Sequence, residues 1–243
     1  MSGLNLRNIM FENNDYFDFN ITNYCNAGCP TCKRYSMPSN PHIKNEVKEF
    51  LIQNRVHMNF DDFKKILYLN EDLFFGKGAQ FCGEFGDPLM HPKIEDFTIF
   101  SCKFFRTLKI NTNAGLKRKK YFENVSHLKN KLVMYFGIDG TTDEINNKYR
   151  IGVNTKTAFE NMNLWKKLKC EPQWDYIVFQ HNIDDVENAL NYAIDNRIQI
   201  NLKINLRETY REIRKINKDQ FKKIQNIVYE KNDKIITFQD YYE

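Results

Sequence analysis

The chain carries three thiols within eight residues, in the stretch Cys25-Asn26-Ala27-Gly28-Cys29-Pro30-Thr31-Cys32. A structural zinc site takes four ligands, which are commonly supplied as two spaced pairs. A [4Fe-4S] cluster also usually takes four thiolates. Three thiols in one loop therefore indicate a cluster that leaves one iron open for a ligand other than cysteine. The alternatives are three incidental cysteines or part of a zinc site.

The CxxxCxxC spacing of Cys25, Cys29 and Cys32 resembles the signature of the radical S-adenosylmethionine (SAM) enzymes. The resemblance implies that the three thiols hold a [4Fe-4S] cluster and that SAM chelates the open iron. An electron from the reduced cluster would then cleave SAM to methionine and a 5′-deoxyadenosyl radical, which takes a hydrogen atom from the substrate. Many members carry an aromatic residue before the last cysteine and others a small one, whereas this chain has Thr31.

Length and composition favour one large domain with a sizeable core, because the chain has 243 residues. The 36 basic residues only slightly outnumber the 31 acidic ones, so a nucleic-acid partner is not indicated. The longest apolar stretch, 132–138, is far too short to span a bilayer, and the first residues are mixed and polar. We therefore expect a cytoplasmic protein whose cysteines serve metal or catalytic roles rather than disulfides.

Six apolar or alternating segments predict β-strands that alternate with amphipathic helices. The near-continuous apolar run at 132–138 is typical of a strand buried in a parallel sheet. The predicted strands are residues 15–21, 79–82, 107–111, 132–138, 174–179 and 199–204. Alternation of strands and helices predicts βαβ units. The expected fold is therefore α/β, a partial (β/α)6 TIM-like barrel of parallel strands with a helical C-terminal tail.

The predicted domains are a radical SAM core at residues 1–207 and a helical extension at 208–243 packed on it, since apolar residues recur there at helical spacing. Residues 36–59 form an insert that either covers the cluster or is an ordinary polar connection. The basic run 117–120 is either a solvated surface or a docking patch for an acidic partner, such as a flavodoxin-like electron donor or nucleic acid.

Polar motifs follow the predicted strands, where the loops of β/α barrels carry their chemistry. The resemblance covers residues 16–207 and includes these loops. Gly86-Asp87-Pro88 resembles the family's GGEP-type loop, which binds the amino group of SAM. Because Asp87 is shorter than the usual Glu, the backbone at Gly86 or the Glu84 carboxylate would share that contact.

Three further SAM contacts are implied by the resemblance. Asn113 and Asp139 lie in segments that resemble the family's ribose-facing segments after the third and fourth strands, and amide and carboxylate groups suit vicinal hydroxyls. Arg150 lies in a YRxG-like segment, from which a guanidinium can pair with the SAM carboxylate.

Substrate contacts are predicted on the later strands. Residues 174–182 resemble an uncharacterised branch near the peptide-modifying, SPASM-type proteins, which places His181 and Asn182 toward the centre, and Arg207 follows the sixth strand. A structural histidine is the alternative. Cys82, beside the presumed SAM loop, is either a hydrogen-atom donor to a substrate radical or a buried thiol. Because no cysteine follows Cys170, an auxiliary SPASM cluster is not expected.

The expected function is therefore a radical SAM enzyme with one [4Fe-4S] cluster and SAM, acting on a peptide. The alternatives are the same chemistry on a nucleotide or small metabolite, and a non-catalytic scaffold that binds the cluster and SAM. The cluster needs an electron donor such as flavodoxin or ferredoxin, and no membrane partner is expected.

Overall fold

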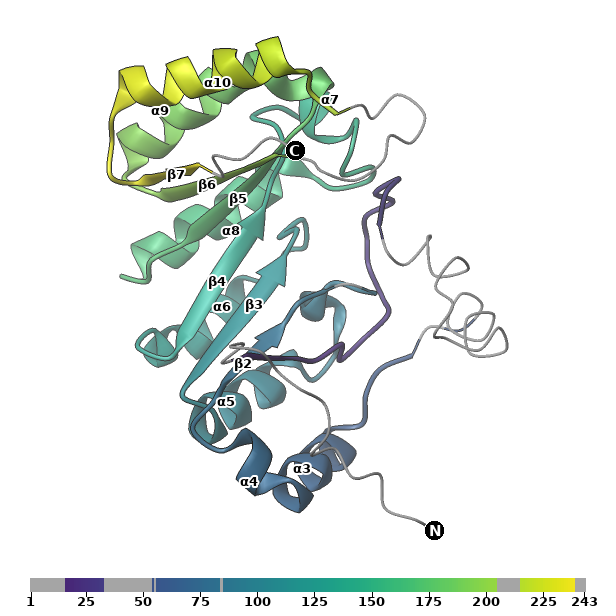
Figure 1. Cartoon of the computed structure of the whole chain (residues 1–243). Coiled ribbons are helices and arrows are strands. Elements are labelled where there is room, and N and C mark those ends of the chain that lie inside the picture. The colour runs from purple at the N-terminus through teal and green to yellow at the C-terminus, as the bar shows by residue number, and fades with distance from the viewer. Residues whose placement is uncertain (1–15, 33–53, 55, 84, 205–214, 239–243) are drawn as a thin grey trace.

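The computed structural model describes residues 16–32, 54, 56–83, 85–204 and 215–238. They contain a seven-stranded sheet in which the strands lie side by side in chain order, and every neighbouring pair is parallel. Figure 1 shows this sheet fanning from β2 to β7. The strands are β1 (Tyr16–Asp18), β2 (Gly78–Phe81), β3 (Thr107–Thr112), β4 (Leu132–Gly137), β5 (Gln173–Val178), β6 (Gln199–Ile204) and β7 (Ile236–Phe238).

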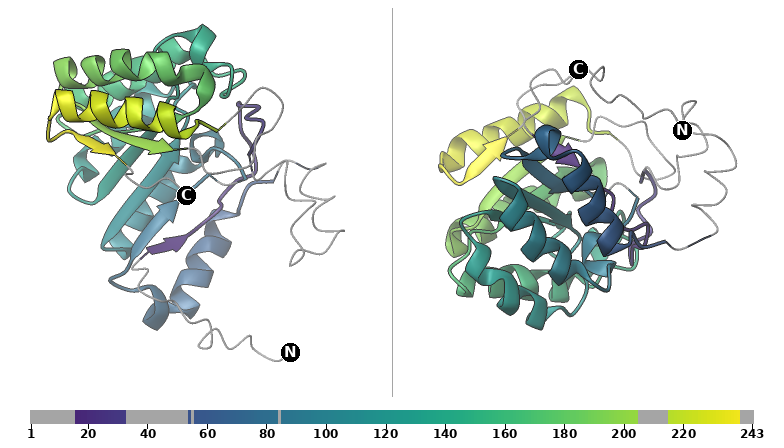
Figure 2. Two further views of the ribbon diagram at one scale, coloured as in Figure 1. Left: turned by 45° about the horizontal axis from the view of Figure 1, so that its top comes forward. Right: turned by 90° about the horizontal axis from the view of Figure 1, so that it is seen from below.

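Helices connect the strands and pack on the outer face of the curved sheet, while the cysteine loop that follows β1 lies on the opposite side (Figures 1 and 2). Parallel neighbours require such crossover connections. The α-helices are α3 (Phe60–Leu69), α4 (Glu71–Phe74), α5 (Ile94–Phe104), α6 (Lys119–Val125), α7 (Asp143–Asn146), α8 (Thr155–Lys167), α9 (Val186–Asn196) and α10 (Lys218–Lys231). The described residues also contain three 3-10 helices, which are η3 (Pro88–Met90), η4 (Ser126–Leu128) and η5 (Gln180–Asp185). The predicted α/β class and parallel barrel-like sheet are confirmed.

Several of the described helices begin at a side-chain cap, whereas α4, α5, α6 and α9 have none. The Asn59 side chain accepts hydrogen bonds from the N–H groups of Asp61 and Asp62 at the start of α3, as its sequence context predicts. Asn154 caps α8 in the same way through the Thr157 N–H. These caps satisfy N–H groups that have no partner inside the helix.

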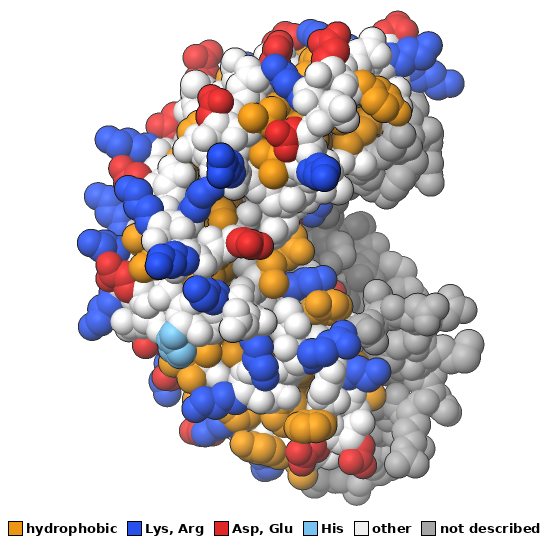
Figure 3. Space-filling model, turned by 90° about the vertical axis from the view of Figure 1, so that its left-hand side faces the viewer, with side chains coloured by type: hydrophobic (Ala, Val, Ile, Leu, Met, Phe, Trp, Pro, Cys, Tyr) orange, Lys and Arg blue, Asp and Glu red, His pale blue; other side chains and the backbone are white. Residues whose placement is uncertain are grey.

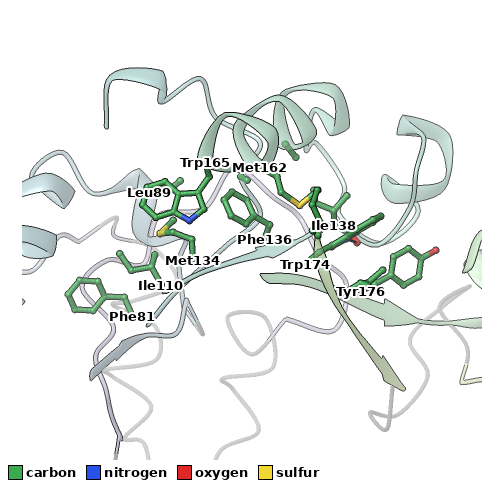
Figure 4. Packing of buried hydrophobic residues seen from close by; sticks show 14 of the residues in the cluster. Phe81, Leu89, Ile110, Met134, Phe136, Ile138, Met162, Trp165, Trp174 and Tyr176 are labelled. Atoms are coloured by element: carbon green, nitrogen blue, oxygen red, sulfur yellow. Dashed lines mark hydrogen bonds between the residues drawn. The ribbon is translucent and has the colours of Figure 1, made fainter. Parts of the chain in front are cut away.

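The core lies between the sheet and its helices, because alternate residues of β3, β4, β5 and β6 face the helices and are buried. In β3 and β5 this alternation is regular along the whole strand. Figure 4 shows Trp165 and Met162 of α8 beside Phe136 of β4, and all three are fully buried. The indole N–H of buried Trp174 donates to the Ile138 carbonyl at 2.8 Å, so the polar atom of this ring is also satisfied.

The C-terminal region differs from a purely helical tail. Helix α10 is present and buries Phe221 and Ile224, but the chain then adds β7, which pairs in parallel with β6 at Ile200 and Ile236. Figure 2 shows α10 and β7 at one edge of the molecule. A strand of three residues is too short for a sequence pattern to reveal. The proposed boundary at 207/208 lies outside the described residues.

The surface carries both signs of charge over the face in Figure 3, with hydrophobic side chains gathered at the end that holds α3 and α4. Leu69 and Phe75 are exposed by 73% and 67% there. Among the described residues, no helix combines the length and the apolar character needed to cross a membrane.

Candidate active site

A cavity of about 330 Å³ lies at the carboxyl ends of the strands, against the cysteine loop. Its wall joins the loop that follows β1 to the loops after β2 and β3 and to the inner faces of β4, β5 and β6. The lining residues used below are Cys25, Cys29, Cys32, Cys82, Gly86, Asp87, Asn111, Asn113, Tyr135, Gly137, Tyr149, Arg150, Asp175 and Lys203. The structure therefore brings most of the predicted site residues to one place.

The three cysteines of the loop all line this cavity. None forms a disulfide within the described residues. The Cys25 sulfur accepts hydrogen bonds from the Ala27 N–H at 3.4 Å and from the Asn113 side-chain amide at 3.6 Å. Within the described part of the chain, no three His, Cys, Asp or Glu side chains are grouped closely enough to bind one metal ion. Cysteine thiolates are the usual ligands of iron–sulfur clusters, so three thiols at one cavity fit such a cluster.

The segment after β4 braces the cysteine loop. The Gly28 N–H donates to the Ile151 carbonyl at 2.8 Å, and the hydroxyls of Thr31 and Tyr149 are 3.0 Å apart. The Tyr149 ring packs on Phe179, with centroids 4.5 Å apart. Thr31 thus replaces an aromatic residue with a hydroxyl that hydrogen-bonds to a distant aromatic residue. No local sequence signal indicates this contact, because its partners are 118 positions apart.

Asp87 is buried, and its carboxylate accepts hydrogen bonds from three other residues of the protein. One oxygen accepts the Leu89 N–H at 2.9 Å and the other the Asn113 N–H at 2.8 Å, while the Thr112 hydroxyl lies 2.9 Å from both. Burial raises the pKa of Asp87, and these hydrogen bonds oppose that effect. The carboxylate therefore ties the loop after β2 to the end of β3.

Gly86 allows the loop after β2 to approach the entry to the cysteine loop. A Cβ atom at this position would lie 2.4 Å from the Thr22 carbonyl oxygen and 2.6 Å from that of Tyr24. The neighbouring Asp87 N–H donates to the same Tyr24 oxygen at 2.6 Å. The predicted SAM loop and cysteine loop are therefore held in direct contact, and only glycine fits there.

Asp139 and Arg150 form a buried pair below the cavity. The Arg150 Nε–H donates to one Asp139 oxygen at 2.7 Å, and the Ile177 N–H donates to the other at 2.7 Å. Burial raises the pKa of Asp139, against the opposing effect of Arg150. Burial alone would lower the pKa of Arg150, but the Asp139 charge and hydrogen bond, together with the smaller effects of Cys29 and Tyr149, outweigh it and the pKa is raised. Because Asp139 is fully buried, its geometry supports orienting Arg150 rather than contacting a ribose.

Gly137 provides the space for the Arg150 guanidinium. A Cβ atom on Gly137 would lie 2.8 Å from Nη2 of Arg150. The guanidinium thus lies over the end of β4 and lines the cavity, while its Nε–H is engaged by Asp139. This leaves the terminal nitrogens on the cavity side, where a carboxylate can bind.

The predicted substrate residues are placed differently. Asn182 is 1% exposed, and its amide donates to the Asp139 and Ile177 carbonyls and accepts the Phe179 N–H. His181 stacks on Phe179 with centroids 5.3 Å apart, and neither residue lines the cavity. Cys82 does line it, with its sulfur 3.7 Å from the Asn20 side-chain oxygen. Glu84 and Arg207 lie outside the described residues, as does most of the 36–59 insert.

His181 predicts a pH-dependent stability. Burial, with Lys148 nearby, lowers the pKa of His181 from 6.5 to about 4. As the pH falls, the unfolded chain binds this proton before the folded protein does. The stability that His181 contributes is therefore complete above pH 6.5 and is lost as the pH falls through the folded pKa. We expect the urea midpoint of a His181→Phe variant, which preserves the stacking on Phe179, to fall less over this range than that of the unmodified protein. Parallel declines in the two proteins would contradict this role.

Four lining residues with polar side chains on the inner faces of the strands were not predicted as site residues. They lie on the inner faces of four adjacent strands and are Asn111, Tyr135, Asp175 and Lys203. Every second residue of β5 and β6 faces the helices and is buried, so the polar residues between them had to face inward. This alternation in the sequence was the signal that could have identified these residues as facing the cavity.

Comparison with known proteins identifies the family. The Radical SAM superfamily profile matches residues 19–193, and the chain therefore belongs to this superfamily of enzymes. The Bacillus subtilis (strain 168) antilisterial bacteriocin subtilosin biosynthesis protein AlbA is 25% identical over 133 residues, which is 54% of this chain and 26% of AlbA.

Solved structures agree on the fold. Streptococcus suis SuiB bound to S-adenosylmethionine has a TM-score of 0.68 and 15% identity, covering 93% of this chain and 50% of SuiB. SuiB bound to the precursor peptide SuiA has a TM-score of 0.70 and 15% identity, with 93% and 49% covered. The chain thus spans about half the length of SuiB and about a quarter of AlbA.

Proposed function

We propose that Cys25, Cys29 and Cys32 hold a [4Fe-4S] cluster, that SAM binds beside it in the same cavity, and that the protein abstracts a hydrogen atom from a peptide. The observation that carries the proposal is the shared cavity, which three thiols line together with the Arg150 guanidinium. When bound, the reduced cluster supplies the electron that cleaves SAM to methionine and the 5′-deoxyadenosyl radical. The membership of the chain in the superfamily supports this chemistry.

The residues of this chain have distinct roles in the proposal. Arg150, oriented by Asp139, binds the SAM carboxylate through its terminal nitrogens. Asn113 orients the Cys25 sulfur and ties the loop after β3 to Asn26, whose side-chain oxygen is 2.9 Å from the Asn113 amide. Asp87 acts as a positioning residue, so that the backbone of its loop faces the SAM amino group. In these roles, the Asp87 and Asp139 carboxylates maintain the shape of the cavity.

A peptide substrate is favoured by the relatives. SuiB has been solved with a precursor peptide, and AlbA is a bacteriocin biosynthesis protein. Cys82 lines the cavity, which supports a role as hydrogen-atom donor to the substrate radical. An external one-electron donor of the flavodoxin or ferredoxin kind completes the proposed cycle.

The test is an anaerobic reconstitution with iron and sulfide, followed by SAM and dithionite as the electron source. We expect 5′-deoxyadenosine and methionine to form in equal amounts, and only when the protein, SAM and dithionite are all present. Chromatography measures both products. Protein that carries its full iron and binds SAM but releases neither product, with or without added peptides, would instead support the scaffold alternative.

A further inference from the structure

The inner faces of β5 and β6 carry a polar group that the proposed SAM chemistry does not use. Asp175 and Lys203 both line the cavity, and the Lys203 ammonium lies 2.5 Å from one Asp175 oxygen. The other Asp175 oxygen accepts the Asn201 side-chain amide at 3.0 Å. Both carboxylate oxygens of Asp175 therefore have donors from the protein.

The Lys203 ammonium has N–H donors that Asp175 does not engage. An ammonium group has three N–H donors, and the structure engages one of them, with Asp175. The Lys203 side chain is 47% exposed, whereas that of Asp175 is 13% exposed. The Lys203 ammonium therefore faces the cavity, and the less exposed Asp175 carboxylate lies behind it.

The carboxylates of the cavity wall reinforce this polarity. Asp87 and Asp175 are the two carboxylate residues among the described lining residues, and each accepts hydrogen bonds from the protein through both oxygens. Beside them, the wall offers the remaining N–H donors of Lys203 to a group that accepts hydrogen bonds and carries negative charge.

The position of the pair suits a substrate rather than SAM alone. Gly137 of β4 pairs with Asp175 of β5 in the sheet register, so a residue without a side chain separates the ion pair from Arg150. Arg150 and Lys203 both line the same cavity. Two cations at one cavity can bind two different carboxylates.

A purely structural role explains the pair poorly. Half-exposed ion pairs contribute about 0–1 kcal/mol to stability, and β5 and β6 are already joined along six register positions, Gln173 to Val178. The pairing of β5 with β6 therefore does not require a lysine on the cavity-facing side of β6.

We propose that Lys203 is the specificity-determining residue that binds a carboxylate of the peptide substrate, with Asp175 as the residue that positions its ammonium. The inference rests on the proposed function, because it places the substrate in the cavity beside SAM. The carboxylate belongs either to an acidic side chain or to a free peptide C-terminus, which offer the same chemistry.

Four synthetic tripeptides test this by ligand-observed NMR titration on cluster-reconstituted, SAM-loaded protein. Three are acetylated and amidated Gly-Glu-Gly, Gly-Gln-Gly and Gly-Lys-Gly, and the fourth is acetylated Gly-Gln-Gly with a free carboxylate. We expect the unmodified protein to bind a carboxylate-bearing tripeptide about tenfold more tightly than the amidated glutamine one, the effect of a charge-assisted hydrogen bond. The preferred carboxylate distinguishes the side chain from the C-terminus.

Three variants distinguish recognition from structure. Lys203→Met exposes the Asp175 carboxylate, so we expect the preference to invert toward the lysine tripeptide. Asp175→Asn keeps an oxygen that accepts from the ammonium but removes its neutralising charge, so we expect the preference for a carboxylate to increase. Lys223→Met removes an equal charge from an exposed pair with Asp184 and should leave the preference unchanged. Opposite shifts in the first two variants are not expected of a pair that only joins strands.

Three outcomes would overturn the inference: equal binding of the tripeptides by the unmodified protein, an unchanged preference in Lys203→Met, or no tripeptide binding by protein that binds SAM. Failure of the proposed function is recognised separately, because SAM would then not be cleaved under dithionite with any tripeptide. Protein that cleaves SAM but does not discriminate among the tripeptides retains the proposed function and refutes the role of Lys203.

Discussion

Replacing Cys29 by alanine is expected to abolish 5′-deoxyadenosine formation. Residues that merely support a metal ligand cost about 10–100-fold when they are changed, so loss of a ligand should exceed about 100-fold. Cys29 is 8% exposed and lies in one cluster of buried residues with Tyr149 and Phe179. Iron and sulfide content per chain and product formation after reconstitution are the measurements. Both should fall together.

Cys102 provides the matched control. It is 2% exposed in the core on α5, away from the cavity, and burial raises the pKa of its thiol to about 12, which makes it unreactive. Cys102→Ala should keep the iron content and product formation, with a loss of about 1 kcal/mol in stability from a small core cavity. Full iron and undiminished SAM cleavage in Cys29→Ala would refute the cluster assignment.

The fold was predictable from the sequence where the strands are long or strongly patterned. The run at 132–138 and the alternation in 174–179 and 199–204 mark β4, β5 and β6, because burial against helices on one face imposes a pattern on each strand. Strand β7 was missed because three residues carry too little pattern. Its place in the sheet depends on α10 returning the chain beside β6, which is a tertiary effect.

The site was predictable only where its chemistry is local. The cysteine spacing lies within one loop, whereas the partners of Asp87 and Asp139 come from other strands. Backbone N–H groups of Asn113 and Ile177 occupy their carboxylates, and no motif within the loops predicts those bonds. The sequence therefore placed both acids at the correct rim but did not reveal that they hold the structure together. Their predicted SAM contacts stay predictions that the geometry does not favour.

Asp139→Asn is expected to lower the free energy of unfolding by about 3–5 kcal/mol, the cost of removing one partner from a buried ion pair. Asparagine still accepts the Ile177 N–H, so the change isolates the charge. Arg150 is only 17% exposed, so its guanidinium would lose the charge partner that offsets its burial. Urea denaturation measures the loss.

Asp184→Asn is the matched control, because Asp184 pairs with Lys223 at the surface, where the side chains of Lys223 and Asp184 are 54% and 86% exposed. This substitution should change the stability by less than about 1 kcal/mol. Comparable small losses in both variants would show that Arg150 does not depend on Asp139. If the large loss is found, the same variant should also bind SAM more weakly by isothermal titration calorimetry, since the carboxylate that stabilises the fold also aims the guanidinium. Stability and SAM affinity would then be coupled through one buried side chain.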